Sequence, residues 1–362
     1  MNETKKIIAE RRIPDALTSK DGVKIKSAKE FEKHREYIKK LLEEHIYGHM
    51  PPAPDHFAVE LDNENARFCA GKAPLRTLTA TVTLGKNKFT FPIRAVIPKS
   101  EKKLPCFVSI NFSSDVPNKY LPIEEIVDGG FAVFAICYSE ITADNKSFRN
   151  GIAKYLSPKR RTLSSPGKIA MWAYAAMRVM DYIETLDCID KDNVAVIGHS
   201  RLGKTALLAA AFDNRFKYAI SNDSGCAGAA ITREKEGEHI DQITTRFPYW
   251  FAKKYRKYAT DEYSLPLDQN YLLSLIAPRH LLVGSAEDDL WADPKSEFIS
   301  TYMASSAWEL YGVPGLIHNG EIPKANTVLD KGNISYHIRH GMHYLSREDW
   351  QIYMNYIKRQ MK

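Results

Sequence analysis

The chain has 362 residues, is 44% hydrophobic and carries a formal net charge of +7, so it can bury a large core. No apolar run approaches membrane-spanning length, and five singly placed cysteines without a C-x-x-C pair argue against a disulfide framework or a zinc site. The charge is too modest to predict nucleic acid as a partner, and we expect the basic run at 158–161 to be a solvated loop.

The hydrophobic pattern changes from helical to strand-like along the chain. Residues 29–46 have apolar side chains at helical spacing, and residues 76–98 alternate around a turn at Gly85, which predicts a hairpin. Further on, strands are expected at 106–110, 131–136, 194–197, 218–221 and 280–284, and helices at 168–186, 204–212 and from about 347. This alternation predicts an α/β fold with a mostly parallel central sheet and helices on both faces, preceded by an N-terminal helix and hairpin extension.

No internal repeat or Ser/Pro-rich linker divides the sequence, so we predict a single domain over residues 1–362. Two weakly patterned insertions, at about 139–167 and 229–270, are expected to form walls of a pocket.

Residues 194–205, Val-Ala-Val-Ile-Gly-His-Ser-Arg-Leu-Gly-Lys-Thr, fit two motifs that predict different functions. The β-branched run predicts a buried strand, which a sharp turn joins to a helix. As a phosphate loop, Gly198-x-x-x-x-Gly203-Lys204-Thr205 matches the Walker pattern. As a nucleophile elbow, the same residues place Ser200 at the apex of the strand-to-helix turn.

The rest of the sequence favours the elbow. A Walker loop usually opens its domain and needs a magnesium-binding aspartate at the end of a nearby strand, whereas about 190 residues precede this motif. An elbow needs an acid and then a histidine later in the chain. Asp289 follows the expected strand at 280–284, and His343 stands just before the last helix. The order Ser200, Asp289, His343 predicts an α/β-hydrolase fold.

The proposed nucleophile is Ser200, and the proposed base is His343, with His337 and His340 as nearby competitors. The acid that orients the histidine has two candidates. Asp289 lies in the usual hydrolase position and is preferred, and Asp223 follows the strand after the elbow. The remaining acids of this region, Glu287, Asp288 and Asp293, are expected to be solvated or structural.

The elbow has leucine instead of glycine two residues after the serine, and its Gly-x-Ser-Arg-x-Gly pattern resembles that of the glucuronoyl esterases. Further stretches resemble the bacterial members of that family, in family order: Tyr47-Gly48 before two prolines, Asn222-Asp223-Ser224-Gly225, Gly237-Glu238 ahead of the aromatic run 247–251, Asp289-Leu-Trp-Ala-Asp-Pro294, and His343 to Trp350. The resemblance extends from about residue 45 to the C-terminus. Members of the family often carry a glutamate where this chain has Asp223, whose side chain is shorter.

Arg201 follows the nucleophile, so its backbone N–H is expected to face an oxyanion, and the resemblance implies that its side chain also stabilises the negative charge. The turn at 111–114 is a second candidate source of oxyanion donors. The resemblance further implies that Lys204, Glu238 and Trp291 contact the hydroxyls and the ring of a glucuronate.

These observations predict a serine esterase that acts on a small-molecule or oligosaccharide ester, most readily an ester of glucuronic acid, through an acyl-enzyme. We expect no metal or organic cofactor and no membrane or nucleic-acid partner, and the sequence leaves the oligomeric state open. The alternatives are an acetyl esterase acting on acetylated sugars and, more remotely, a P-loop nucleotide-binding protein. The N-terminus has no apolar stretch typical of a signal peptide, which predicts a cytoplasmic protein, or a secreted or periplasmic one if the N-terminus is truncated.

Overall fold

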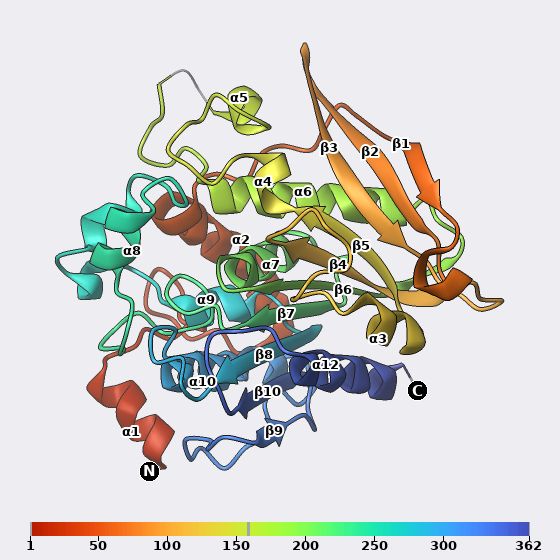
Figure 1. Cartoon of the computed structure of the whole chain (residues 1–362). Helices are drawn as coiled ribbons and strands as arrows, with labels where there is room; N and C mark the ends of the chain where they lie inside the picture. Colours follow the sequence, from red (N-terminus) through yellow and green to blue (C-terminus); the bar gives the residue numbers. More distant parts are fainter. Residues whose placement is uncertain (1, 158–159, 362) are drawn as a thin grey trace.

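The computed structural model describes residues 2–157 and 160–361. In this part of the chain, ten strands form one twisted sheet in the order β1-β2-β3-β5-β4-β6-β7-β8-β10-β9 (Figure 1). The strands are β1 His56–Asn65, β2 Leu75–Leu84, β3 Asn87–Val96, β4 Leu104–Asn111, β5 Ala132–Cys137, β6 Ile189–His199, β7 Tyr218–Asn222, β8 His280–Ala286, β9 Thr327–Leu329 and β10 Ile334–Arg339. The six strands from β5 to β10 in this order are parallel, and β1, β2, β3 and β9 pair antiparallel at the two edges.

Helices cover both faces of the sheet (Figure 1). One face packs against α2 Ala28–Leu42, α6 Lys168–Ile183, α7 Arg201–Phe212, α9 Gln269–Ser274 and α10 Pro294–Ala304, and the other against α3 Ile123–Asp128 and α12 Arg347–Gln360. The alternation of strand side chains produces these two cores. In β6, Val194 and Val196 point into the larger core, and Ala195 and Ile197 point into the smaller one.

The remaining elements are short and lie mostly in the connections. They are α1 Glu3–Glu10, η1 Glu43–Tyr47, η2 Phe68–Gly71, α4 Tyr138–Ile141, α5 Ala153–Leu156, α8 Ile240–Arg246, η3 Tyr255–Tyr258, η4 Glu262–Ser264 and α11 Ser306–Glu309. None of the described helices is long and apolar enough to cross a membrane.

Two of the expectations need correction. The helix expected at 204–212 begins at Arg201, immediately after the turn. Of the basic run, Pro158 and Lys159 lie outside the described residues. Arg160 is exposed, as expected, whereas the loop residue Arg161 is only partly exposed, because its guanidinium lies 3.6 Å from the ring centre of Phe148 and donates to Pro166 O at 2.8 Å.

The order of the strands places four connections side by side. Strands β6, β7, β8 and β10 are neighbours and run parallel, so their carboxyl ends meet at one edge of the sheet. Ser200, Asp223, Asp289 and His343 each follow one of these four strands. Residues up to 143 positions apart in the sequence are therefore brought to the same edge.

Candidate active site

The turn at Ser200 is strained in the manner of an elbow. Ser200 lies between the end of β6 and the start of α7, with φ 58° and ψ −127°. Residues other than glycine rarely adopt this backbone conformation. Its N–H donates to Asn222 O on β7 at 2.9 Å. A Cβ on Gly198 would lie 2.0 Å from Leu202 O, so the helix can approach the strand only because residue 198 is glycine. The geometry presents the Ser200 side chain at the apex of the turn.

The first turn of α7 leaves backbone donors available. The carbonyl of Ser200 accepts from Gly203 N and Lys204 N, whereas the N–H groups of Arg201 and Leu202 have no backbone partner in the described residues. Donors at a helix N-terminus favour a negative charge. The Arg201 N–H thus meets the requirement for an oxyanion donor beside Ser200.

His343 and Asp289 are joined by a short hydrogen bond. His343 Nδ1 donates to Asp289 Oδ2 at 2.6 Å. The Asp289 side chain is 5% exposed and the His343 side chain is 44% exposed, so the imidazole reaches outward from a buried carboxylate. This bond fixes the tautomer that leaves Nε2 free to accept a proton.

Asp223 lies close to this pair but has different partners. Oxygen or nitrogen atoms of Asp223, Asp289 and His343 all lie within 4.8 Å of one another. Asp223 Oδ2 is 3.5 Å from the Arg339 guanidinium and accepts from Tyr344 N at 3.3 Å, and Oδ1 has no partner in the described residues. Burial, followed by the charges of nearby carboxylates, raises the pKa of Asp223 well above its usual range. Of the two acids, Asp289 is the one that contacts the imidazole.

The other nearby histidines have separate roles in the structure. His337 is buried and bonds Asp349 at 2.7 Å, and the exposed His340 bonds Glu287 at 2.8 Å. His199 packs against His343 with ring centroids 4.4 Å apart, and burial followed by the charge of His343 lowers the pKa of His199 to about 3. His199 therefore forms a neutral wall beside the imidazole of His343.

The other acids near Asp289 contribute differently. Asp288 is exposed and lines the cavity described below. Asp293 caps the N-terminus of α10 through Ser296 N at 2.9 Å. Together with Glu287, which pairs with His340, they occupy solvated or structural positions.

Arg201 lies in an aromatic enclosure and is bound to an aspartate that the sequence did not single out. Its guanidinium is 4.6 Å from the ring centre of Trp250 and also faces Phe112 and Phe247. Nη1 donates to Asp144 Oδ2 at 2.5 Å, and Asp144 Oδ1 accepts from Trp250 Nε1 at 2.7 Å. Asp144 and Trp250 thus fix the direction of the Arg201 side chain.

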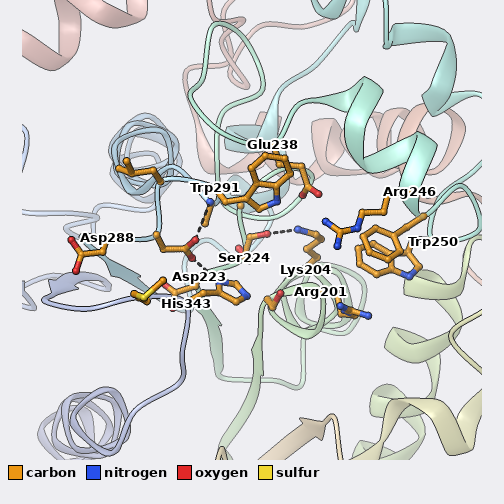
Figure 2. A pocket seen from close by; sticks show the side chains of 17 residues that line it. Arg201, Lys204, Asp223, Ser224, Glu238, Arg246, Trp250, Asp288, Trp291 and His343 are labelled. Carbon is orange, nitrogen blue, oxygen red and sulfur yellow. Dashed lines mark hydrogen bonds and ion pairs between the residues drawn. The ribbon is translucent and has the colours of Figure 1, made fainter.

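A cavity of about 460 Å³ joins these groups. It is lined by Ser200, Arg201, Lys204, Asp223, Ser224, Gly225, Glu238, Arg246, Phe247, Trp250, Asp288, Asp289, Leu290, Trp291, Ala292, Met342 and His343. Figure 2 shows His343 and Asp223 at one end, Arg246 and Trp250 at the other, and Lys204 between them. The insertion at 229–270 supplies four lining residues, whereas 139–167 supplies none of them and reaches the site through Asp144.

Lys204 is held inside this cavity by the turn after β7. Its side chain is nearly fully buried, and Nζ donates to Ser224 O, as Figure 2 shows. Burial lowers the pKa of Lys204, and the nearby Glu238 carboxylate opposes that shift. The Walker interpretation has no support in this geometry, because the lysine contacts a backbone carbonyl deep in the fold.

Glu238 and Trp291 lie together because their two loops are paired. Glu238 N donates to Trp291 O at 3.0 Å. A Cβ on Gly237 would lie 2.3 Å from Leu290 O, so the close approach of the loops requires glycine there. Glu238 is buried, whereas Trp291 is 48% exposed, and both line the cavity (Figure 2).

Several site residues were not predicted. The turn at 111–114 does not line the cavity, but its Phe112 faces the Arg201 guanidinium at 5.6 Å, and a second oxyanion donor from this turn stays a prediction. Arg246 points into the cavity toward Lys204 (Figure 2), and sequence reasoning missed it. The aromatic run at 247–251 was noticed only as a family resemblance. Its Phe247 and Trp250 now have a physical role, since both enclose Arg201.

Comparisons with known proteins agree on one family. Residues 80–312 match the family model described as glucuronyl esterase of fungi. A carbohydrate esterase from an unknown prokaryotic organism is 32% identical over 96% of this chain and 89% of its own length. A 4-O-methyl-glucuronoyl methylesterase of Thermothelomyces thermophilus is 27% identical over 84% of this chain and 73% of its own.

Solved structures show the same likeness. The glucuronoyl esterase from Solibacter usitatus is 31% identical, with a TM-score of 0.90 over 97% of this chain and 98% of that one. A promiscuous CE15 esterase from a marine bacterial metagenome is also 31% identical, with a TM-score of 0.87 over 96% of both chains.

Proposed function

Because the chain belongs to the glucuronoyl esterase family, we propose that it hydrolyses carboxylic esters of glucuronic acid through an acyl-enzyme on Ser200. One observation supports this proposal above the others. The imidazole of His343, bonded to Asp289 at 2.6 Å, lines the same cavity as the strained elbow residue Ser200. A serine hydroxyl needs such a base to become nucleophilic at neutral pH.

In the acylation step, Ser200 Oγ attacks the ester carbonyl while His343 Nε2 takes the hydroxyl proton. Asp289 holds the imidazole in the reactive tautomer and stabilises the imidazolium. The tetrahedral intermediate collapses when the bond to the alcohol breaks and His343 returns the proton to the departing oxygen. Water then attacks the acyl-enzyme by the same route and releases the acid and free Ser200. The structure has no hydrogen bond between Ser200 and His343 in its described residues; such bonds often shorten only with substrate.

The negative charge of the intermediate is stabilised at Arg201. Its backbone N–H has no backbone partner among the described residues, and Arg201 lines the same cavity as Ser200. Asp144 and Trp250 hold this side chain in place, so little reorganisation is needed when the charge develops.

The polar and aromatic lining of the cavity suits a sugar acid. Lys204 and Arg246 offer hydrogen-bond donors and positive charge, Glu238 offers acceptors, and the indole of Trp291 offers a flat apolar face. Hydroxyl groups need donors and acceptors, and the C–H face of a sugar ring packs on an aromatic ring. These groups support a glucuronate on the acyl side of the ester, with the alcohol leaving past His343.

An ester panel on the wild type and on Ser200→Ala tests the proposal. We expect hydrolysis of methyl and benzyl glucuronate by the wild type, unchanged by EDTA, and a loss of at least about 10³-fold in kcat for Ser200→Ala. Acetylated xylose and p-nitrophenyl acetate represent the competing acetyl esterase, which stays in the panel because one relative is described as promiscuous. A strong preference for acetyl esters would overturn the substrate assignment, and an active Ser200→Ala would overturn the mechanism.

A further inference from the structure

The loop that carries His343 is wrapped around one buried guanidinium. Arg339 is the last residue of β10, and its side chain is 6% exposed. Nη1 donates to His340 O at 2.9 Å, and Nη2 donates to Met342 O at 3.2 Å and to Tyr344 O. The two carbonyls on either side of His343 thus bind the same nitrogen atom.

The same guanidinium also faces two buried carboxylates. Arg339 Nε donates to Asp349 Oδ2 at 2.9 Å, and Nη2 is 3.5 Å from Asp223 Oδ2. Asp349 also accepts from His337 and, at the start of α12, from Ser346 N at 2.7 Å. Arg339 therefore links the His343 loop to β7, to β10 and to the C-terminal helix at once.

The backbone of the same loop is also tied to the loop of Asp289. Glu287 N donates to Arg339 O at 2.9 Å, and Asp288 N donates to Gly341 O at 3.0 Å. Gly341 has φ +99°, and a Cβ there would lie 3.2 Å from Arg339 Nη1. The loop can close around the guanidinium in this conformation because residue 341 is glycine.

We propose that Arg339 is a positioning residue for the esterase reaction. Its guanidinium fixes residues 340–344 so that the His343 imidazole meets both Asp289 and Ser200. The inference rests on the proposed function, since it has Arg339 position His343, the general base of that reaction. Arg339 does not line the cavity, so it acts through His343 and does not touch the substrate. The planar guanidinium reaches three carbonyls and two carboxylates from three nitrogen atoms, with the two N–H groups of Nη2 shared among Met342 O, Tyr344 O and Asp223 Oδ2. A lysine ammonium, with three donors on one atom, cannot reach all five.

Three variants separate positioning from general stability. Arg339→Lys keeps the charge and removes the fork. Arg35→Lys is the matched control, because Arg35 is equally buried and binds the carbonyls of Leu275 and Ala277 and the carboxylate of Glu32, on α2 and away from the cavity. Gly341→Ala keeps the Arg339 side chain but strains the loop, because residue 341 has φ +99° and a Cβ there would lie 3.2 Å from Arg339 Nη1. It takes the place of Arg339→Lys if that variant does not fold.

The kinetic readout is kcat and KM on methyl glucuronate, after melting curves have established that each variant is folded at the assay temperature. Arg339→Lys and Gly341→Ala should lower kcat by about 100-fold, because small misplacements of a catalytic group have effects of this size, and KM should stay near the wild-type value. Arg35→Lys should keep the wild-type kcat. A folded Arg339→Lys with unchanged kcat would overturn the proposal, and so would an equal loss in Arg35→Lys or a loss confined to KM.

Proton NMR provides a readout that does not depend on turnover. The short bond from His343 Nδ1 to Asp289 should give a far-downfield N–H resonance, assigned by its disappearance in Asp289→Asn. We expect this resonance to shift or broaden in Arg339→Lys and to stay unchanged in Arg35→Lys; an unshifted resonance in Arg339→Lys contradicts the positioning role. An active Ser200→Ala would refute the proposed function itself, whereas an inactive Ser200→Ala beside an unaltered Arg339→Lys would refute only the inference about Arg339.

Discussion

Two adjacent turns each bring a carboxylate close to His343, yet they are built for different purposes. In the turn after β7, residues 222–225, the main chain is buried and Asp223 has a left-handed φ of 43°. In the turn after β8, residues 287–293, Asp289 is buried but its neighbours Asp288, Leu290 and Trp291 are exposed. The two turns touch, since a Cβ on Gly225 would lie 3.0 Å from Ala292 Cα. We call residues 222–225 the inner turn and residues 287–293 the outer turn. The inner turn supports the site, and the outer turn presents side chains to the cavity.

The largest effect should come from the outer turn. Asp289→Asn keeps the shape of the side chain but removes the negative charge that selects the tautomer of His343 and stabilises the imidazolium. We expect kcat on methyl glucuronate to fall by about 10⁴-fold with little change in melting temperature. A loss of tenfold or less, measured on protein shown to be folded by circular dichroism, would mean that Asp223 is the acid.

A smaller effect, on stability and its pH dependence, should come from the support of the inner turn. Glu297 on α10 accepts from Ser224 N at 2.8 Å and Gly225 N at 2.9 Å, and burial raises its pKa from 4.5 to about 7. The folded protein therefore holds the Glu297 proton at a pH where the unfolded chain has lost it. This stabilisation is complete below pH 4.5 and is lost as the pH rises through about 7.

Glu297→Gln removes this titration while keeping an acceptor for the two N–H groups. Relative to the variant, the wild type should lose on the order of 2 kcal/mol of unfolding free energy between pH 5 and pH 7.5. Urea unfolding of both proteins at the two pH values measures the difference. Titrating groups remote from Glu297 cancel because both proteins share them, whereas Asp223, whose pKa the Glu297 charge helps to raise, contributes to the difference as well. A difference that does not change with pH would show that Glu297 is ionised throughout.

Asp223 should matter less for the reaction than Asp289. It bonds Tyr344 N and faces Arg339, and it makes no hydrogen bond to the imidazole in the described residues. Asp223→Asn should lower kcat by about tenfold or less, because the amide oxygen can still accept from Tyr344 N. Steady-state kinetics beside Asp289→Asn decide the assignment, and a loss of 10⁴-fold for Asp223→Asn would reverse the roles of the two acids.

The sequence predicted the fold class and the family, and the comparisons confirm both. These predictions succeeded because they depended on local patterns: apolar strands, the elbow at Ser200, and an acid and a histidine in a fixed order. Strand β10 was missed, although it carries the His343 loop, because its six residues, Ile-Ser-Tyr-His-Ile-Arg, mix polar and apolar side chains that are all buried.

Residues that act through tertiary contacts were also missed. Asp144 lies 57 residues from Arg201 in the sequence, and Arg339 is 116 residues from Asp223. Nothing in the local pattern around either residue indicates its partner, since the contacts exist only after the sheet has brought distant loops together. The resemblance to a family likewise identified Trp291 as a sugar contact without showing how it is held.

The smallest effect should come from the exposed end of the outer turn. Trp291 is half-exposed, and its carbonyl, which bonds Glu238 N, is kept in any substitution of the side chain. Trp291→Ala should therefore raise KM for methyl glucuronate about fivefold through the loss of the ring face, at an almost unchanged kcat. Val328→Ala is the control, because Val328 is comparably exposed on β9 and lies outside the cavity. An unchanged KM for Trp291→Ala would show that the indole does not contact the sugar. A fall in kcat alone would show that the outer turn acts by positioning Asp289.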